Sequence, residues 1–473
     1  MRYLDHLRQF SDEQGRLNDF IELRDGRVLL GGQVDVLDLA VRYGTPLEVA
    51  FCPQITRRIR EMEAAFAEAS RRTGYRGGFV YAYATKANFA REATATAVAA
   101  GAHYETSSAI DVRIAHRLWQ SGALPADRFV LCNGSKERAY LDAILDLRLA
   151  GFANVVPVLD APEEFEALAA CPEPLLLGVR ERKDPQDLAE GATYGYDRFG
   201  MLPDELAALA KRVAGTHHRI VLYHAMVGSQ LDDSAFFIRE LQESLAGFVS
   251  LRSLAPAMDY FDFGGGVPTS AYSLGFSFDY AGFVADLQRM VMAACDAAGL
   301  PHPHLVGEFG RYTVADHGVH IFRLGRVKQG QAGAPPWYLL DGSLMVALPD
   351  ILIVSGQQFI CLALNHHDAE AGPVVLGGRR TCDSDDFYPR PGDPPLILPL
   401  VGPQAPAEPL LIAFFGTGAY QAMLAGEGGA HHCLAPEAPK VVIEERGGEL
   451  VTTVIPEQPP EDVLSELGYE VDW

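Results

Sequence analysis

Residues 78–88 read GFVYAYATKAN, and this stretch decides the fold. Its first part, Gly78–Ala84, is a continuous apolar run without the alternation of a half-exposed strand, which is typical of a buried parallel strand. Lys86 follows almost directly. In an α/β barrel, polar residues at the carboxyl ends of the strands build the active site. The stretch therefore predicts a barrel strand with a functional lysine at its carboxyl end.

The same pattern recurs from Gly78 to Gly307, with amphipathic stretches between the apolar runs. Examples of the predicted helices are Gln54–Arg72, Pro203–Val213, Ser234–Leu251 and Tyr280–Ala298. Eight strands that alternate with helices over about 250 residues predict a (β/α)8 barrel. The predicted strands are Gly78–Ala84, Ala102–Tyr104, Phe129–Leu131, Val155–Leu159, Leu175–Val179, Ile220–Tyr223, Tyr260–Phe263 and Leu305–Gly307.

After about Val314 the pattern becomes β-rich, with many Pro and Gly residues in 391–408. We predict a C-terminal β-sandwich or β-barrel domain. Asp19–Asp38 also looks β-like, with a turn at Asp25–Gly26, and we expect it to join this domain. The domains are then residues 1–44 (N-terminal segment), 45–313 (barrel) and 314–473 (β domain). The predicted strands of the β domain are Val319–Leu324, Trp337–Leu340, Ile351–Val354, Phe359–Leu364, Pro373–Leu376, Pro409–Phe415, Lys440–Glu445 and Glu449–Ile455.

Charge and composition exclude several classes of function. Lys plus Arg number 39 and Asp plus Glu number 62, so the formal net charge is −23. This charge argues against binding to nucleic acid or to an anionic membrane. No apolar stretch has the length of about 18 residues that a spanning helix needs, and Met1–Phe20 lacks the apolar core of a signal peptide. Seven scattered cysteines without CxxC spacing predict a reduced, cytoplasmic protein, and the histidines show no metal-ligand spacing.

Polar and glycine-rich segments follow five of the predicted barrel strands. Because the carboxyl ends of barrel strands share one face, these segments are expected to form one site. They are Thr85–Asn88, Arg180, His224 with Gly228–Gln230, Gly264–Gly266, and Glu308–Arg311.

Each candidate has a chemical reading and a structural alternative. A partly desolvated Lys86 would have a lowered pKa and a nucleophilic amine suited to Schiff-base chemistry, unless it is a surface lysine. The N–H groups of Gly264–Gly266, with Ser229 and Arg311, suit a phosphate, although three glycines also make a plain turn. Glu308 ends a buried strand and needs a cation, which an ion pair with Arg180 or Arg311 would also provide.

The acidic run that surrounds Cys382 in the β domain suggests another role. Many carboxylates would raise the pKa of this thiol and keep it protonated, so that it can donate a proton. The alternative is a solvated acidic loop.

Tyr83–Asn88 resembles the cofactor-lysine motif of the alanine-racemase-fold, pyridoxal-phosphate-dependent decarboxylases, which include ornithine, diaminopimelate and biosynthetic arginine decarboxylases. The biosynthetic arginine decarboxylases look most similar, although this chain is shorter. Further matching motifs, in family order, are Tyr43–Leu47, Leu131–Lys136, Arg198–Gly200, Gly228–Gln230, Gly264–Gly266, Glu308–Arg311, Thr381–Asp385 and Gly418–Gln421.

The resemblance implies roles for individual residues. Lys86 would bind pyridoxal 5'-phosphate as a Schiff base, Glu308 would pair with the pyridine nitrogen, and Cys382 would reprotonate the substrate carbon after carbon dioxide leaves. Asp341 and Asp383 would hold a distal cation of the substrate. The phosphate would be held by Ser229, Gly264, Gly265, Gly266, Arg311 and Tyr420, and Glu105 with Arg180 would form an acid–base pair beside the ring.

Two positions depart from the family pattern. The family has His-x-His-x-Gly-Ser, whose second histidine stacks on the cofactor. Here His224 is followed by Met226 in that second place. A thioether packs on a ring but donates no proton. Phe309 replaces the usual proline after the glutamate, which changes the stiffness of the loop and the wall of the pocket.

The implied function is decarboxylation of an amino acid with a distal cation, such as arginine, ornithine or lysine, in polyamine biosynthesis. The resemblance also implies a homodimer in which Cys382 and Asp383 of one chain approach Lys86 of the other. An alternative is decarboxylation of an amino-acid conjugate, as in siderophore biosynthesis. Less favoured are a diaminopimelate decarboxylase, whose substrate-binding arginine is absent here, an amino-acid racemase, and a catalytically inactive regulator.

Overall fold

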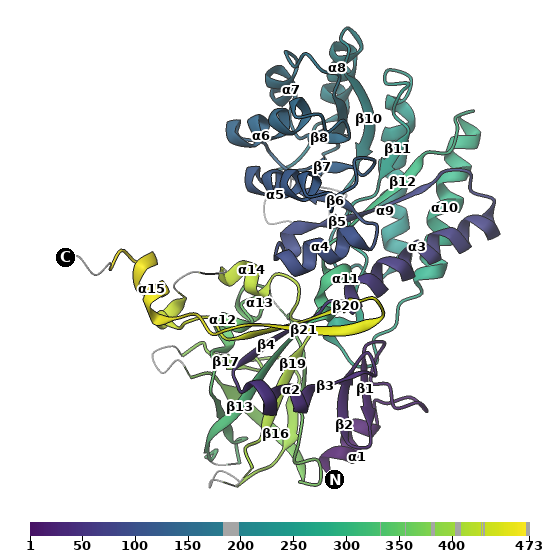
Figure 1. Cartoon of the computed structure of the whole chain (residues 1–473). Coiled ribbons are helices and arrows are strands. Elements are labelled where there is room, and N and C mark those ends of the chain that lie inside the picture. The colour runs from purple at the N-terminus through teal and green to yellow at the C-terminus, as the bar shows by residue number, and fades with distance from the viewer. Residues whose placement is uncertain are drawn as a thin grey trace. The chain divides into compact units, whose positions relative to one another are not determined.

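The structure is a computed structural model that describes residues 1–182, 198–331, 333–354, 356–379, 384–402, 408–426, 428 and 431–469. Its contacts define two units, shown in Figure 1. The barrel unit comprises Thr56–Pro268 and Phe278–Thr313, and the β unit comprises Met1–Ile55, Thr269–Ser277 and Val314–Trp473.

The barrel unit contains a closed barrel of eight parallel strands, in the spatial order β10-β11-β12-β5-β6-β7-β8-β9. This confirms the predicted barrel, and every predicted strand overlaps an observed one. Small and branched apolar side chains fill its interior, among them Val80, Leu131, Val158 and Val306. The strands are β5 (Phe79–Ala84), β6 (His103–Thr106), β7 (Val130–Cys132), β8 (Val155–Leu159), β9 (Leu176–Arg180), β10 (Arg219–His224), β11 (Tyr260–Asp262) and β12 (His304–Phe309).

Helices connect the strands, and short polar residues start several of them. Ser108, Asp233 and Asp279 each accept a hydrogen bond from a backbone N–H of the helix that follows, which stabilises a helix by about 1 kcal/mol. Such caps separate each helix from the loop before it. The helices are α3 (Pro53–Thr73), α4 (Arg91–Ala99), α5 (Ala109–Gln120), α6 (Arg138–Leu149), α7 (Pro162–Leu168), α8 (Pro203–Ala214), α9 (Ser234–Leu251), α10 (Tyr280–Ala297) and α11 (Arg311–Val314).

The β unit is built on a ten-stranded sheet with its own buried apolar core. Its central strand, β13 (Gly318–Lys328), pairs antiparallel with β4 (Leu47–Phe51), β14 and β19. Its other strands are β14 (Trp337–Leu340), β15 (Ile360–Ala363), β16 (Ala371–Gly377), β17 (Phe387–Tyr388), β18 (Leu396–Pro399), β19 (Leu411–Phe415), β20 (Lys440–Arg446) and β21 (Glu449–Ile455).

The first 55 residues lie within the β unit. Strands β1 (Ile21–Arg24), β2 (Arg27–Leu30) and β3 (Val34–Asp35) form a separate small sheet, and the predicted turn joins β1 to β2. Asp25 and Gly26 have φ of 51° and 72°, as a tight hairpin turn requires. Apolar residues of this sheet belong to the core of the β unit. Our expected boundary assigned β4 to the barrel, whereas β4 pairs with β13 and β20.

The segment Ile351–Val354, predicted as a strand, is helical. It lies in α13 (Asp350–Ile353), which starts after Pro349, and Leu352 and Ile353 are exposed. A four-residue apolar run fits a strand and one turn of helix equally well, so periodicity does not separate them. Among the described residues of this unit, the sequence also did not indicate β17, β18 or five other helices: α1 (Tyr3–Arg8), α2 (Val36–Tyr43), α12 (Leu344–Ala347), α14 (Gln421–Ala425) and α15 (Pro460–Glu466).

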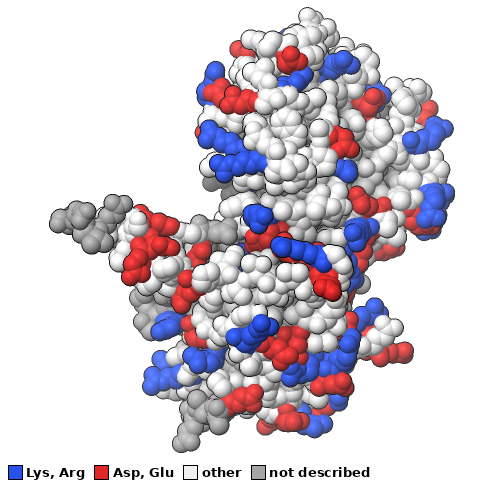
Figure 2. Space-filling model, viewed as in Figure 1, with Lys and Arg blue, Asp and Glu red and all other residues white. Residues whose placement is uncertain are grey.

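The described surface carries charges of both signs. On the face drawn in Figure 2, basic and acidic side chains are interspersed, and acidic side chains gather over α15, which carries Glu461, Asp462 and Glu466. No helix among the described residues is long and apolar enough to cross a membrane.

Candidate active site

The carboxyl ends of the barrel strands bring a group of polar side chains to one face. Lys86 follows β5, Glu105 lies in β6, and Arg180, His224 and Asp262 are the last residues of β9, β10 and β11. The register pairs His224 with Arg180 on one side and with Asp262 on the other. Because all eight strands are parallel, their carboxyl ends share one face, and the chemistry collects there.

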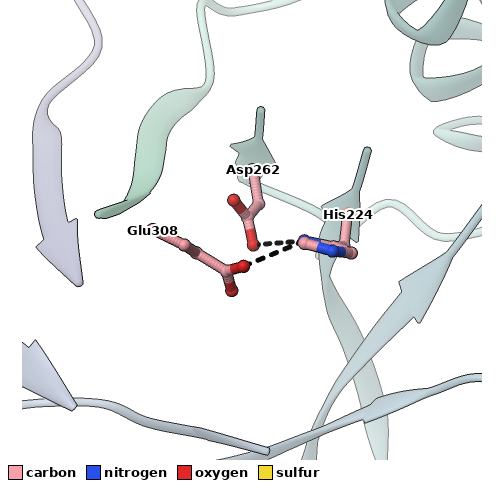
Figure 3. A group of neighbouring side chains, drawn as sticks. All are labelled: His224, Asp262 and Glu308. Atoms are coloured by element: carbon pink, nitrogen blue, oxygen red, sulfur yellow. Dashed lines mark hydrogen bonds and ion pairs between the residues drawn. The ribbon is translucent and has the colours of Figure 1, made fainter. Parts of the chain in front are cut away.

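His224, Asp262 and Glu308 form a buried cluster at this face (Figure 3). Nδ1 of His224 lies 2.7 Å from Oδ2 of Asp262 and 3.7 Å from Oε2 of Glu308. The other carboxylate oxygen of Asp262 accepts a hydrogen bond of 2.9 Å from the N–H of Gly264. Among the described residues, His224 is the one ion-pair partner of these two acids. The predicted alternative, an ion pair of Glu308 with Arg180 or Arg311, is therefore absent from the described contacts.

Burial controls the protonation of this cluster. It raises the pKa of Asp262 to about 7, and the pKa of Glu308 is raised by burial and by the negative charge of Asp262. The pKa of His224 is lowered to about 4 by burial, so this imidazole stays neutral at pH 7. The cluster thus holds two acids without a full positive charge to balance them, an arrangement that favours an added cation.

Glu105 and Asn133 extend the cluster across the barrel. Asn133, which follows β7, donates from Nδ2 to Oε1 of Glu308 over 2.7 Å. Glu105 is only 2% exposed, and its pKa is raised well above the usual range by burial and by Glu308. Three carboxyl groups and one amide therefore share the barrel interior.

Lys86 lies in a 3-10 turn, Thr85–Ala87, at the end of β5, and its side chain is exposed. We expected the chain to desolvate it partly, and the described chain does not. The ammonium group still acts on the cluster, since its charge lowers the pKa of both Glu105 and His224. Lys86 thus presents an accessible amine beside the buried acids.

Arg180 is held over an aromatic ring. Its guanidinium carbon and that of Arg198 each lie 4.3 Å from the centroid of the Phe199 ring. Cation–π contacts of this kind orient a guanidinium. No ion pair between Arg180 and Glu105 occurs among the described residues.

The glycine segment after β11 packs closely against its neighbours. A Cβ atom on Gly264 would lie 2.6 Å from the carbonyl oxygen of Ala225 and 2.8 Å from the sulfur of Met226, and Gly264 has φ of 70°. The N–H of Gly264 is occupied by Asp262, contrary to the expectation that it faces a phosphate. Among the described residues, the N–H groups of Gly265 and Gly266 have no partner, so they remain available to an anion.

The remaining expected phosphate ligands in the barrel unit lie in loops beside this segment. Ser229 is exposed in the loop that follows β10, and Arg311 is half-buried at the start of α11. The carbonyl of Gly228 would lie 2.8 Å from a Cβ on Gly266, so the two loops are in contact. Ser229, Gly265, Gly266 and Arg311 thus supply hydroxyl, amide and guanidinium donors.

Phe309 lies in an aromatic cluster of the barrel unit. It is buried and packs against Tyr81, Phe263 and Tyr312, with ring centroids 4.7, 6.1 and 5.8 Å away. Its side chain joins the layer between β12 and the neighbouring elements of the barrel unit. The expected effect of this residue on the pocket wall stays a prediction.

Two expected site residues lie in the β unit. Asp341 accepts a hydrogen bond from the Thr45 hydroxyl (2.6 Å) and another from the N–H of Arg323 (2.8 Å), and it borders a cavity of about 910 Å³. Tyr420 precedes α14 with φ of 68°. Cys382 and Asp383 lie outside the described residues.

Asp262 and Asn133 were not among the site residues predicted from the sequence. Asp262 lies in the apolar strand Tyr260–Phe263, and a carboxylate within such a strand is a signal in itself because burial of an unpaired charge is costly. Asn133 stood in a quoted motif, but nothing local indicates that it contacts Glu308, which is 175 positions away.

The described residues fit pyridoxal phosphate. Its pyridine nitrogen is a cation when protonated, and it would supply the positive charge that is missing beside the buried acids. The N–H groups of Gly265 and Gly266 suit its phosphate. The ligand atoms of His224, Asp262 and Glu308 also lie within 4.8 Å of one another, so this trio could hold a metal ion.

A barrel with these groups at its carboxyl face is the architecture of a cofactor-dependent enzyme. Residues 53–315 match the family described as pyridoxal-dependent decarboxylase, pyridoxal binding domain, so the chain belongs to this family. Among curated proteins, the chain is 27% identical over 318 residues to the biosynthetic arginine decarboxylase of Thermosynechococcus vestitus, covering 62% of this chain and 49% of that protein. It spans about half the length of the curated relatives that it matches.

Solved structures share the fold. The biosynthetic arginine decarboxylase of Campylobacter jejuni superposes with a TM-score of 0.83 at 19% identity, covering 99% of this chain and 91% of that one. A diaminopimelate decarboxylase from M. jannaschi superposes with a TM-score of 0.78 at 20% identity, covering 95% and 98%. These likenesses confirm the alanine-racemase type of fold, a barrel with a separate sheet unit.

Proposed function

We propose that this protein decarboxylates an amino acid that carries a distal cationic group, namely arginine, ornithine, lysine or a relative, with pyridoxal 5'-phosphate as cofactor. The observation that carries the proposal is the buried His224–Asp262–Glu308 cluster beside Lys86 in a barrel of the pyridoxal-dependent decarboxylase family. The curated relatives named biosynthetic arginine decarboxylase favour the cationic substrate. The amine product would then serve polyamine biosynthesis.

The bound cofactor supplies an electron sink for the electrons that the departing carboxylate leaves behind. Lys86 would hold it covalently, Glu308 would pair with its ring nitrogen, and the donors at Ser229, Gly265, Gly266 and Arg311 would hold its phosphate. Neutral His224 orients Asp262 without adding charge. Cys382 would supply the proton that replaces carbon dioxide, and Asp341 and Asp383 would hold the distal cation. A carboxylate accepts about four hydrogen bonds. Asp341 accepts two and also pairs with the Arg323 guanidinium at 3.7 Å, so it keeps acceptor capacity for a ligand.

We infer a homodimer whose active sites combine residues of both chains. The family resemblance implies such a dimer, in which Cys382 and Asp383 of one chain would approach Lys86 of the other. Light scattering across a range of protein concentrations tests this, and a monomer at all concentrations would refute it. The free cysteines of the described chain, Cys132 among them, support a reducing, cytoplasmic location.

The decisive experiment is carbon dioxide release by the cofactor-loaded protein. The panel is L-arginine, L-ornithine, L-lysine and meso-diaminopimelate, and Lys86→Ala is the control. We expect release from one of the three basic amino acids and none from Lys86→Ala. Release from meso-diaminopimelate alone would overturn the substrate class.

A second candidate is a decarboxylase of an amino-acid conjugate. Met226 favours it, because the sulfur packs against Gly264 where the family places a histidine. A wild-type protein that binds the cofactor but releases no carbon dioxide from the four free amino acids would support this candidate. Met226→His is the matching variant, and gain of activity on arginine or ornithine would identify Met226 as a specificity residue.

A further inference from the structure

Two buried oxygen atoms near the acid cluster lack any hydrogen-bond donor among the described residues. They are Oδ1 of Asn133 and Oε2 of Glu105. Asn133 is 9% exposed and Glu105 is 2% exposed, so water does not readily satisfy either atom. An unsatisfied buried acceptor costs about 1–3 kcal/mol. Two of them in one cluster suggest that a proton is shared there.

The Asn133 amide lies between two carboxyl groups. Its Nδ2 donates to Oε1 of Glu308 over 2.7 Å, and the amide is also within hydrogen-bonding reach of Glu105. Because Nδ2 is directed to Glu308, Oδ1 is left as an acceptor. An amide oxygen accepts a hydrogen bond from a carboxylic acid but gains nothing from a carboxylate.

We propose that Asn133 is a positioning residue that joins an ionised Glu308 to a protonated Glu105, with the Glu105 acid donating to Oδ1 while Nδ2 donates to Glu308. One proton on Glu105 satisfies both orphaned oxygens. The bridge leaves Glu308 as the acid that carries the negative charge toward the ring nitrogen of the cofactor. This inference rests on the proposed cofactor role of Glu308 and adds the residue that sets its charge.

The surroundings of the two acids are consistent with this division of charge. Glu308 faces His224 and Asp262, and Glu105 faces Lys86, Asp111 and Glu308. Burial, Glu308 and Asp111 raise the pKa of Glu105, while Lys86 and Asn133 lower it, and the raising causes prevail. The short hydrogen bond of 2.7 Å from the amide goes to Glu308, and a donor to the ionised form favours that form.

The test measures binding of pyridoxal phosphate without any substrate, by absorbance titration from pH 5 to 9. Asn133→Leu removes the bridge at nearly constant volume. A hydrogen bond to a charged group is worth about 1.5–3 kcal/mol, so we expect about 10- to 100-fold weaker binding. Loss of the donor raises the pKa of Glu308, so the acidic limb of the binding profile should shift to higher pH. Asn133→Asp, which adds a charge, should shift it further.

Glu105→Gln is the second variant, because an amide replaces a neutral acid and can still donate to Oδ1. We expect its affinity for pyridoxal phosphate to stay within about threefold of the wild type, whereas Glu105→Leu should weaken binding like Asn133→Leu. Asn154→Leu, whose amide bonds to the Ala126 carbonyl elsewhere in the barrel unit, is the matched control. The thermal melting of each cofactor-free variant separates misfolding from a specific effect.

Two results would overturn the inference: wild-type affinity and pH profile in Asn133→Leu, or loss of affinity in Glu105→Gln as large as in Asn133→Leu. The second would mean that Glu105 works as a charged group. Since no substrate is present, a wild-type protein that binds pyridoxal phosphate but decarboxylates nothing leaves this inference intact. Failure of the proposed reaction and failure of the bridge are thus distinguishable.

Discussion

Asp262 is a buried acid whose pKa is raised from 3.8 to about 7. The folded chain therefore keeps a proton that the unfolded chain releases, and the folded state loses stability as the pH rises from about 4 to about 7. Asp262→Asn removes this loss and preserves the shape of the side chain. We compare the unfolding free energy of the cofactor-free variant with that of the cofactor-free wild type. This difference should change in favour of the variant by on the order of 2–4 kcal/mol from pH 4.5 to pH 8.

Urea unfolding at the two pH values measures this difference. Asp286→Asn, an exposed acid on α10, should show no comparable change with pH. If the stability difference between Asp262→Asn and wild type is the same at both pH values, Asp262 is not the buried acid that its surroundings indicate.

Gly264 is a second position at which the structure requires one particular residue type. A Cβ atom there would collide with the Ala225 carbonyl and the Met226 sulfur, and φ of 70° disfavours any other residue. Gly264→Ala should lower the unfolding free energy by about 2–3 kcal/mol and weaken binding of pyridoxal phosphate. Gly299→Ala has a similar φ of 66° but open space around it, so it should cost only about 1 kcal/mol. Equal costs in thermal or urea unfolding would refute the clash.

At the scale of elements, Lys136 joins three pieces of the barrel unit. Its ammonium is fully buried, donates to the carbonyl oxygens of Gly134 (2.7 Å) and Val158 (2.5 Å), and pairs with Glu164 of α7 at 3.1 Å. It thereby fixes the loop after β7, which also carries Asn133. Lys136→Ala leaves the Glu164 charge unpaired and should cost about 3–5 kcal/mol.

The double variant Lys136→Met with Glu164→Leu should recover part of that loss, because it leaves no buried charge. Urea unfolding of the wild type, Lys136→Met, Glu164→Leu and the double variant forms the cycle. Additive losses would show that the pair does not interact. The double variant should also be tested for binding of the cofactor. If its unfolding free energy recovers but its binding stays weak, then the Lys136 contacts position the loop that carries Asn133, beyond their effect on stability.

The helices and strands also show where hydrophobic periodicity is enough to predict an element from the sequence. Val155–Leu159 and Ser234–Leu251 match β8 and α9 residue for residue. The helix is long enough to show its period, and the apolar run of β8 is rich in β-branched residues, which favour a strand. The strand prediction for Ile351–Val354 is wrong because four apolar residues are too few to show a period. Strand β17 is two residues long and leaves almost no pattern to detect.

At the scale of the whole molecule, each unit is assembled from separate parts of the chain. Strand β4 lies between β13 and β20, both of which come from the C-terminal part. A fragment of residues 1–313 retains β4 without either partner, and its unpaired edges favour aggregation. A fragment of residues 56–313 retains all eight barrel strands and omits β4. We expect a higher soluble yield from 56–313 than from 1–313, and the reverse order would contradict this assignment of β4.

The barrel, the β-rich second part and most of the polar residues that follow the strands are predictable from the amino-acid sequence. Apolar runs that alternate with amphipathic helices fit few folds, and Lys86, Arg180, His224 and Glu308 each stand beside such a run. Which of these groups meet depends on the tertiary structure. Closure of the barrel brings Asn133 and Glu308, 175 positions apart, to 2.7 Å. Burial then sets the protonation of Asp262 and Glu105, because desolvation depends on the surrounding side chains and not on the local sequence.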